Sequence, residues 1–453
     1  MLLRFRCKNF RSIREEQELS LIAAKTRTDE KSESLIDTSF EDLKLLRCAA
    51  IYGPNASGKS NVLAALSTFS QMVSESQRLW KPDGQIPHYS PFLLDEDSRG
   101  EPTEFEIVFL LDSSVLRYGF RFDRTAFLAE WLVDATSRDK VLFRRELNEG
   151  ETTFSFPARN LVKSAEDGRH LESIRMDVRL NSLLLSAGAQ RNNPALSKIS
   201  GYLAGYLEIL PNRDSDEYEE MTRLRTWHRD RARRGEAAKM LAFADVGIRE
   251  ITLSTLDPSF LFNPNVEPSL RIRAPDLYPH GEEFPPSAGL WLSHAGAAGK
   301  SYFLSEKHES AGTLAYLRIL APLLNKLRDG GILLIDELES SLHPTLAREL
   351  VRIFNSPELN PKGAQFVFTT HNTNLLDLQL LRRDQVWFTE KSREGTTRLF
   401  PLTDYQPRTN QNIELGYLGG RFGALPYLDE QLLRETLIPE EPVQASLHFS
   451  EKA

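Results

Sequence analysis

The segment GPNASGKS at residues 53–60 has the residue types and the spacing of a phosphate-binding loop. Gly53 is followed, after four residues, by Gly58, Lys59 and Ser60, which completes the pattern of such a loop. The glycines let successive backbone N–H groups turn toward phosphate oxygens, and the lysine places a cation beside the terminal phosphates. The serine hydroxyl is a hard ligand for Mg²⁺. An ordinary glycine-rich turn is the alternative, and the apolar run before the loop and the helical pattern after it argue against that.

A second Gly-Lys-Ser triplet lies at 299–301, within HAGAAGKS. Only two residues separate Gly296 from Gly299, and no apolar strand precedes them. We therefore interpret this segment as the tip of a loop.

A carboxylate pair ends the apolar run ILLIDE at 332–337. Parallel sheets bind ligands at the carboxyl ends of their strands, which is where Asp336 and Glu337 would stand. We expect Asp336 to hold Mg²⁺, mostly through water, and Glu337 to align and deprotonate an attacking water molecule. A solvated strand end is the alternative reading of the same pair.

A histidine, His371, follows the buried run QFVFTT at 365–370. At the end of a strand it could reach a γ-phosphate and sense its presence. A plain surface histidine is the alternative.

The segment ESAGT at 309–313 stands directly before a strongly helical stretch. The Ser310 hydroxyl, the Gly312 backbone and the start of a helix together could bind an anion. Serine and threonine are also common helix caps, so a simple cap is the alternative.

The elements that must position these residues follow from hydrophobic periodicity. We expect a strand at each of 1–10, 44–52, 103–111, 115–122, 126–133, 331–336 and 365–370, and a hairpin within 142–155. We expect helices at 60–73, 314–327 and 346–354, and a helical, more polar stretch from 171 to 245. Alternation of strand and helix predicts a largely parallel core sheet with helices on both faces.

Composition restricts the class of protein. Of 453 residues, 40% are hydrophobic and 26% are charged, which is enough for a buried core. The net charge of −8 excludes a generally basic nucleic-acid coat. Two cysteines exclude a disulfide framework or a zinc site built on several cysteines. No apolar run reaches the length of a membrane span, and charges at positions 4, 6 and 8 argue against a signal peptide. We expect a cytoplasmic protein without membrane contact.

One basic segment stands out within the polar middle of the chain. RLRTWHRDRARR, from Arg223 to Arg234, contains six arginines and one aspartate. It could contact the phosphates of double-stranded DNA. A solvated helix face, or an interface with an acidic partner, is the alternative.

The motifs taken together resemble the ABC-type ATPase heads, a group that includes SMC-like, OLD-like and RloA-like proteins. The resemblance rests on GPNASGKS, ESAGT, ILLIDE, SSLHP and FTTHN, in that order. Four further segments look like the RloA-like and OLD-related bacterial ATPases in particular: NFRSI at 9–13, YSPFLLDE at 89–96, TEFEIVF at 103–109 and GYLGGRFGALP at 416–426. The resemblance covers roughly residues 1–135 and 286–426.

The resemblance implies a head-to-head dimer that encloses two ATP molecules with Mg²⁺. Residues of the phosphate loop and its neighbours would hold one ATP in cis: Gly53, Asn55, Ala56, Ser57, Gly58, Lys59, Ser60, Asn61, Arg11 and Ser12. Ser310 and Gly312 would meet the γ-phosphate bound by the other protomer, and His371 would be the switch histidine. Catalysis would rest on Glu337, His371 and Lys59, and the metal on Ser60 and Asp336.

Three departures from the resemblance are visible. The signature reads ESAGT and not LSGGQ, and His343 stands where transporters usually carry aspartate. A glutamine-loop residue has no firm position, Gln85 being the nearest in sequence. About 30 residues follow the last head-like motif, too few for the nuclease domain of OLD enzymes.

The expected fold is therefore α/β, a P-loop NTPase of the ABC-type head class with an antiparallel β subdomain and a mainly helical insertion. The expected parts are an N-terminal half of the head at 1–165, the insertion at 166–285, a C-terminal half at 286–430 and a frayed tail at 431–453. The insertion is too short, and too poor in heptads, for a long SMC arm.

The expected function is ATP hydrolysis by a homodimer, or a higher homo-oligomer, that controls a separately encoded nuclease or toxin in anti-phage defence. The effector and the defence role come from the resemblance alone. A slow nucleotide switch or scaffold for a partner protein is one alternative, and a DNA-repair or chromosome ATPase is another.

Overall fold

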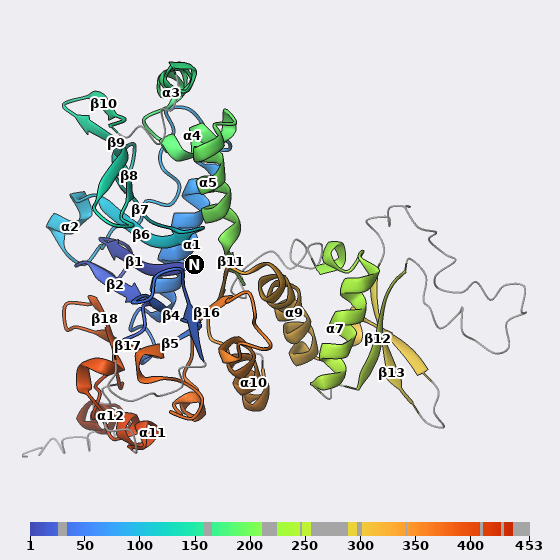
Figure 1. Ribbon diagram of the computed structural model, residues 1–453. Coiled ribbons are helices and arrows are strands. Elements are labelled where there is room, and N and C mark those ends of the chain that lie inside the picture. Colours follow the sequence, from blue (N-terminus) through green and yellow to red (C-terminus); the bar gives the residue numbers. More distant parts are fainter. Residues whose placement is uncertain are drawn as a thin grey trace, which may run out of the picture.

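The computed structural model describes residues 1–25, 34–157, 165–210, 224–244, 247–254, 289–296, 301–340, 342–407, 411–426 and 430–437. Two large sheets of the described residues lie in the left half of the view in Figure 1. No helix in the described ranges is both long enough and apolar enough to cross a membrane.

The core sheet has six strands in the order β11-β15-β16-β5-β17-β18. Their bounds are Leu207–Ile209, Ile332–Ile335, Gln365–Thr369, Cys48–Tyr52, Val386–Lys391 and Thr397–Pro401. The pairs from β11 through β17 are parallel, and only the hairpin β17–β18 is antiparallel. The prediction of a largely parallel core sheet is therefore confirmed.

Helices cover both faces of this sheet, as the alternation of strand and helix predicted. On β5, Ala49 and Ile51 pack into the same core as α1 (Lys59–Glu75). Cys48, Ala50 and Tyr52 pack on the opposite side. There they join α9 (Ala311–Asp329) and α10 (Pro344–Asn355). Continuous burial of β5 on both faces explains why its sequence has no alternation.

The second sheet has seven antiparallel strands in the order β10-β9-β8-β7-β6-β1-β2. Their bounds are Glu151–Ser155, Lys140–Asn148, Phe127–Asp134, Ser114–Phe122, Thr103–Leu111, Leu2–Lys8 and Gln17–Ser20. The expected strands and the expected hairpin are all present. A short helix, α2 (Glu96–Gly100), lies before β6.

Three helices pack against this sheet and α1: α3 (Ala165–Asp177), α4 (Leu184–Gln190) and α5 (Pro194–Tyr206). A fully buried carboxylate, Glu130 of β8, accepts hydrogen bonds from the backbone N–H groups of Leu184 and Leu185 at 2.7 and 3.0 Å. It also accepts one from the Tyr118 hydroxyl at 2.9 Å. These bonds fix the start of α4 against the sheet.

A smaller unit lies beyond α9 and contains α7 (Arg231–Phe243) with a three-stranded sheet (Figure 1). The strands are β12 (Ile248–Ser254), β13 (Gly289–Ala295) and β14 (Ser301–Ser305), all antiparallel. Most of the second Gly-Lys-Ser triplet lies outside the described residues, and its Ser301 begins β14.

One expected strand is wrong. The run 44–52 forms two strands in different sheets, β4 (Lys44–Leu46) and β5, separated by Arg47. β4 pairs with β3 (Leu35–Asp37). The Arg47 side chain, between the two strands, is buried and donates to the Asn360 carbonyl at 2.7 Å.

The middle of the chain is mainly helical where it is described, but it also supplies two strands. β11 joins the edge of the core sheet, and β12 joins β13. The limits 166–285 for an insertion therefore stay a prediction. Near the C-terminus lie α11 (Ile413–Leu418) and α12 (Glu430–Leu437), and the tail from 438 lies outside the described residues.

Candidate nucleotide site

The phosphate loop connects β5 to α1, and its backbone explains its glycines. Gly58 has a φ of 105°, in the region that favours glycine. A Cβ at Gly58 would stand 2.0 Å from the Thr397 Oγ1, and one at Gly53 would stand 2.4 Å from the Thr389 Oγ1. Ala56 also has a positive φ, of 62°. The loop is thus pressed against the hairpin β17–β18 from behind.

The Lys59 side chain lies within the loop. It is buried, and its ammonium donates hydrogen bonds to the carbonyls of Gly53 at 2.9 Å and Pro54 at 3.1 Å. Burial lowers the pKa of Lys59, and the nearby carboxylates of Asp336, Glu337 and Glu339 act in the opposite direction. A partly desolvated cation facing a carboxylate cluster is suited to hold phosphate oxygens.

The acidic pair stands at the end of β15 as predicted. The Asp336 Oδ1 accepts a hydrogen bond from the Thr369 hydroxyl at 2.5 Å, and that hydroxyl accepts one from the Glu337 N–H at 2.8 Å. Glu337 has a φ of 51° and an exposed side chain. A left-handed backbone at a non-glycine residue costs about 1–3 kcal/mol and recurs at functional sites. Thr369 of β16, which sequence reasoning missed, therefore fixes both acids.

The switch segment after β16 is held by a third carboxylate, Glu339, which sequence reasoning also missed. Glu339 accepts hydrogen bonds from the Thr370 hydroxyl at 2.6 Å and from the His371 N–H. His371 itself is exposed. Partial burial of its imidazole and the charge of Lys59 lower the pKa of His371, while Glu339, Glu337 and Asp336 act to raise it. The structure thus brings His371, Lys59 and the acids to one edge of the core sheet.

The NFRSI turn reaches this edge from the seven-stranded sheet. Asn9 and Arg11 have positive φ values of 50° and 52°. Asn9 is fully buried, and its side chain bonds to Phe92, Ser98 and Glu101.

The fixed turn places Arg11 and Ser12 beside the first turn of α1. The Asn61 side chain donates to the Ser12 hydroxyl at 2.7 Å, and Arg11 donates to the Asn61 Oδ1 at 3.5 Å. Asn9 is the residue in this turn that sequence reasoning missed.

Two threonines of the hairpin β17–β18 support the loop from behind, and sequence reasoning missed both. The hydroxyls of Thr389 and Ser57 are 2.6 Å apart. The Thr397 hydroxyl donates to the Ser57 carbonyl at 2.9 Å and lies 2.7 Å from the Ser12 hydroxyl. No local motif marks either threonine, because their partners are over 300 positions away.

Ser310 is the N-cap of α9 within its own chain. Its hydroxyl accepts from the Thr313 N–H at 3.0 Å and lies 2.8 Å from the Thr313 hydroxyl. The capping geometry expected as an alternative is therefore present. Ser310, Gly312 and the loop residue Asn55 are all exposed. A role of Ser310 and Gly312 toward a second protomer stays a prediction.

The donor set fits Mg²⁺. Ser60 is exposed in the first turn of α1, and Asp336 is half-buried in the cluster beside Lys59. A hydroxyl and a carboxylate oxygen are hard donors, and Mg²⁺ is commonly held by one or two carboxylates together with substrate phosphates. Within the described ranges no group of three or more His, Cys, Asp or Glu side chains could hold a metal alone.

The basic segment is used partly inside the protein. Arg225 pairs with the buried Glu306, and Arg234 donates to the carbonyls of His228 and Arg229. Arg233 lies over the Trp227 ring at 5.9 Å. Arg229 and Arg231 are exposed, and Arg223 lies outside the described residues. The charge open to DNA is therefore smaller than the sequence suggests.

The strand, glycine loop and helix, with a carboxylate pair at the end of β15 in the same sheet, define a P-loop nucleoside triphosphatase of the α/β class. Residues 48–377 match the family model described as "AAA domain, putative AbiEii toxin, Type IV TA system". The chain belongs to this AAA family. It is an ATP-binding P-loop domain with an antiparallel β subdomain.

Comparison with solved structures finds heads of SMC proteins, each at 14% identity. The SMC head domain from Thermotoga maritima has a TM-score of 0.37, covering 88% of this chain and 98% of that one. An Smc head bound to the C-winged helix domain of ScpA also scores 0.37, covering 88% and 97%. The Smc head domain with an extended coiled coil, bound to the C-terminal domain of ScpA derived from Pyrococcus furiosus, scores 0.39 and covers 93% and 98%. No curated protein sequence matches the chain.

Proposed function

We propose that this protein hydrolyses ATP as a dimer that encloses two ATP–Mg²⁺ and controls a separately encoded effector, a nuclease or a toxin, in anti-phage defence. We also infer that it belongs to the RloA-like, OLD-related group of ABC-type heads. The observation that carries the hydrolytic part is the gathering of Lys59, Asp336, Glu337, Glu339 and His371 at one edge of the core sheet.

The roles of these residues follow from their contacts. Lys59, whose carbonyl partners belong to the loop itself, would donate to phosphate oxygens. Glu337 would orient and deprotonate water from its fixed backbone at the end of β15. Mg²⁺, held by Ser60 and Asp336, would neutralise charge on the phosphate oxygens. Glu339 is a positioning residue, because it holds the segment that carries His371.

The dimer is supported by exposure and by helix geometry. Ser310 and Gly312 stand exposed at the start of the 19-residue helix α9. The N–H groups of a helix start favour anions. A second copy would bring this helix start to the phosphate of the first.

The test is steady-state ATP hydrolysis with and without double-stranded DNA, on the wild type and on Glu337→Gln. We expect the variant to bind ATP normally and to hydrolyse it about 10²–10⁴-fold more slowly, as for loss of a general base. Glu358→Gln, an exposed acid away from this edge, is the matched control and should retain full activity.

Two outcomes would redirect the proposal. Normal hydrolysis by Glu337→Gln would mean that another group orients the water. A slow rate of ATP hydrolysis that does not change when DNA is added would favour a nucleotide switch or scaffold for a protein partner. Turnover stimulated by DNA would favour recognition of nucleic acid, in defence or in repair.

A further inference from the structure

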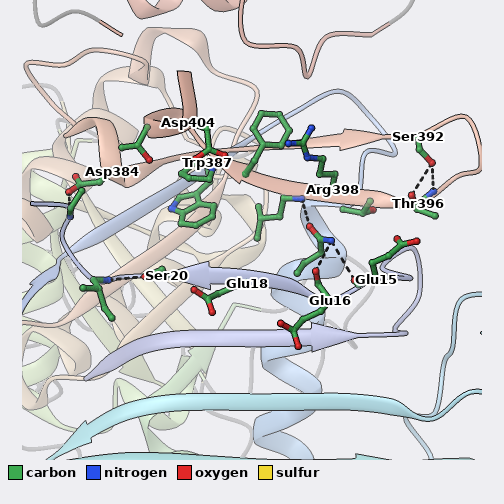
Figure 2. A pocket seen from close by; sticks show the side chains of 18 residues that line it. Glu15, Glu16, Glu18, Ser20, Asp384, Trp387, Ser392, Thr396, Arg398 and Asp404 are labelled. Atoms are coloured by element: carbon green, nitrogen blue, oxygen red, sulfur yellow. Dashed lines mark hydrogen bonds between the residues drawn. The ribbon is translucent and has the colours of Figure 1, made fainter. Parts of the chain in front are cut away.

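A cleft of about 830 Å³ separates the edges of the two large sheets. Its walls are β2, the edge strand of the seven-stranded sheet, and the hairpin β17–β18 at the edge of the core sheet. Figure 2 shows side chains of both walls around the open space between them. None of the proposed phosphate, metal or catalytic residues lines this cleft, whereas Thr397, which supports the phosphate loop, does.

The indole of Trp387 lines the cleft and lacks a hydrogen-bond partner. Its side chain is 6% exposed, and its Nε1 has no partner among the described residues. In Figure 2 the ring projects from β17 toward the space beside β2. A buried N–H donor without an acceptor is costly, about 1–3 kcal/mol. The Nε1 atom is itself buried, so a turn of the ring toward the cleft would bring this donor to an acceptor that binds there.

The edge of β2 offers a regular row of backbone groups. The Leu21 N–H donates to the Leu3 carbonyl, so alternate residues of this strand turn their backbone toward β1. Glu18 and Ser20 must then turn their N–H and C=O groups outward, toward the cleft. Among the described residues, no backbone partner pairs with these two.

The opposite edge is closed to an incoming strand. On β18 the outward N–H of Thr397 is bound by the Ser12 carbonyl, and that of Leu399 by the Gln17 Oε1 at 2.7 Å. Pro401 has no N–H. An added strand can therefore pair with β2 and not with β18.

The charge of the lining selects a basic partner. Five carboxylates and one arginine line the cleft: Glu15, Glu16, Glu18, Asp384, Asp404 and Arg398. Arginines outside the lining hold three of the acids within 3 Å, as in the pairs Arg14–Glu15, Arg6–Glu18 and Arg382–Asp384. The Glu16 carboxylate makes a longer contact, 3.9 Å to Arg6, and its side chain is 54% exposed. Asp404 is exposed as well.

We propose that this cleft binds an extended, basic segment of a partner protein as an added strand on β2. Glu18 and Ser20 would supply the backbone pairing, Glu16 and Asp404 would bind lysine or arginine side chains, and Trp387 would donate to a carbonyl of the segment. The proposal deepens the proposed function, because the identification of this partner with an effector rests on that function. Binding itself does not require hydrolysis.

The test is selection of random octapeptides, displayed on phage, by the purified protein without nucleotide, followed by affinity measurement with the selected peptides. We expect lysine or arginine at alternate positions, and loss of binding when alternate backbone nitrogens of the peptide are methylated. Spermine is the probe for attraction by charge alone, because it is a small polycation without a peptide backbone. If spermine displaces the peptide at the same concentration of positive charge, strand addition is overturned.

Three variants locate the site. The pair Glu16→Lys and Asp404→Lys should weaken peptide binding about tenfold or more. Ser20→Pro removes an outward N–H at an edge position that tolerates proline, and it should weaken binding similarly. Trp387→Phe should weaken it about five- to tenfold.

The matched controls are Glu149→Lys with Glu358→Lys, and Trp291→Phe on β13, all outside the cleft. Binding that survives every cleft variant, or no enriched peptide at all, would overturn the proposal. ATP hydrolysis is measured on the same proteins. A wild type that hydrolyses ATP but binds no peptide rejects the cleft alone, while a wild type that binds peptide but does not hydrolyse ATP rejects only the ATPase proposal.

Discussion

At the residue scale, the site depends on charges held close together by hydroxyl groups. Lys59 is buried beside three carboxylates, and the Thr369 hydroxyl fixes both Asp336 and the backbone of Glu337. Such a cluster is poised for a polyanion with a metal ion, because phosphates would satisfy the lysine and the metal would satisfy the acids.

Replacing Lys59 by alanine tests the phosphate loop directly. We expect ATP affinity to fall about 10- to 100-fold, because the loss of a charge-assisted hydrogen bond costs about 1.5–3 kcal/mol. Isothermal titration calorimetry with ATP and Mg²⁺ measures the change, with Lys362→Ala, an exposed lysine, as the control. Unchanged affinity in the Lys59 variant would remove this loop from the nucleotide site.

At the element scale, the hairpin β17–β18 acts as a support for the loop. Thr397 binds the Ser57 carbonyl and the Ser12 hydroxyl, so one side chain connects the loop, the NFRSI turn and the last strand of the core sheet. The bonds are buried or partly buried, which makes their loss costly.

Thr397→Val keeps a side chain of similar size and removes that hydroxyl. We expect the free energy of unfolding to fall by about 1–3 kcal/mol, since the Ser57 carbonyl loses its partner, and ATP affinity to fall with it. Thr153→Val on the exposed strand β10 is the control, because its hydroxyl makes only an exposed 3.3 Å bond. Chemical denaturation monitors stability, and a variant as stable as the wild type would contradict the supporting role.

A second prediction concerns the segment before α7. His228 is fully buried, and burial together with Arg234 lowers its pKa to about 3. In the unfolded chain the imidazole has a pKa of about 6.5. As the pH falls below that value, only the unfolded chain takes up the proton, so the free energy of unfolding falls.

We expect the wild type to lose about 2 kcal/mol more than His228→Leu between pH 7.5 and pH 5. Urea denaturation at both pH values measures the difference, and His170→Leu, an exposed histidine of α3, is the control. Parallel pH dependence in the wild type and the His228 variant would show that this imidazole titrates normally.

At the scale of the whole molecule, the proposed dimer depends on the start of α9. Ser310 serves as a cap inside its own chain, and the proposed dimer gives it a second role toward the phosphate of a partner. A substitution that removes the hydroxyl would affect both roles at once, because loss of the cap alone lowers the free energy of unfolding by about 1 kcal/mol.

The variant Ser310→Asp separates the capping role of Ser310 from its proposed role toward the phosphate of a second protomer. Aspartate is as good a cap as serine, so the free energy of unfolding should stay within about 0.5 kcal/mol of the wild type. The negative charge of aspartate, however, would repel a phosphate. We expect ATP-dependent dimerisation and hydrolysis to be lost, measured by light scattering and phosphate release, while Ser310→Thr keeps both. Full hydrolysis by Ser310→Asp would place this helix start outside the nucleotide site.

Much of the site and the fold was predictable because it is encoded locally. The glycine spacing, the acids after ILLI and the histidine after QFVFTT are fixed by short segments, and periodicity predicted most strands and helices. The sequence by itself determined that a P-loop, an acidic strand and a parallel core sheet exist in this protein.

Tertiary structure decided the rest. Thr369, Glu339, Thr389 and Thr397 act on partners that are distant in the sequence, and no local pattern shows which strands become neighbours. The same holds for the split of 44–52, because β4 pairs with β3 while β5 enters the core sheet. It holds too for the arginines of the basic segment, several of which are used within the protein. Hydrogen bonds between distant residues are set by packing, because only the folded sheet brings their groups within 3 Å.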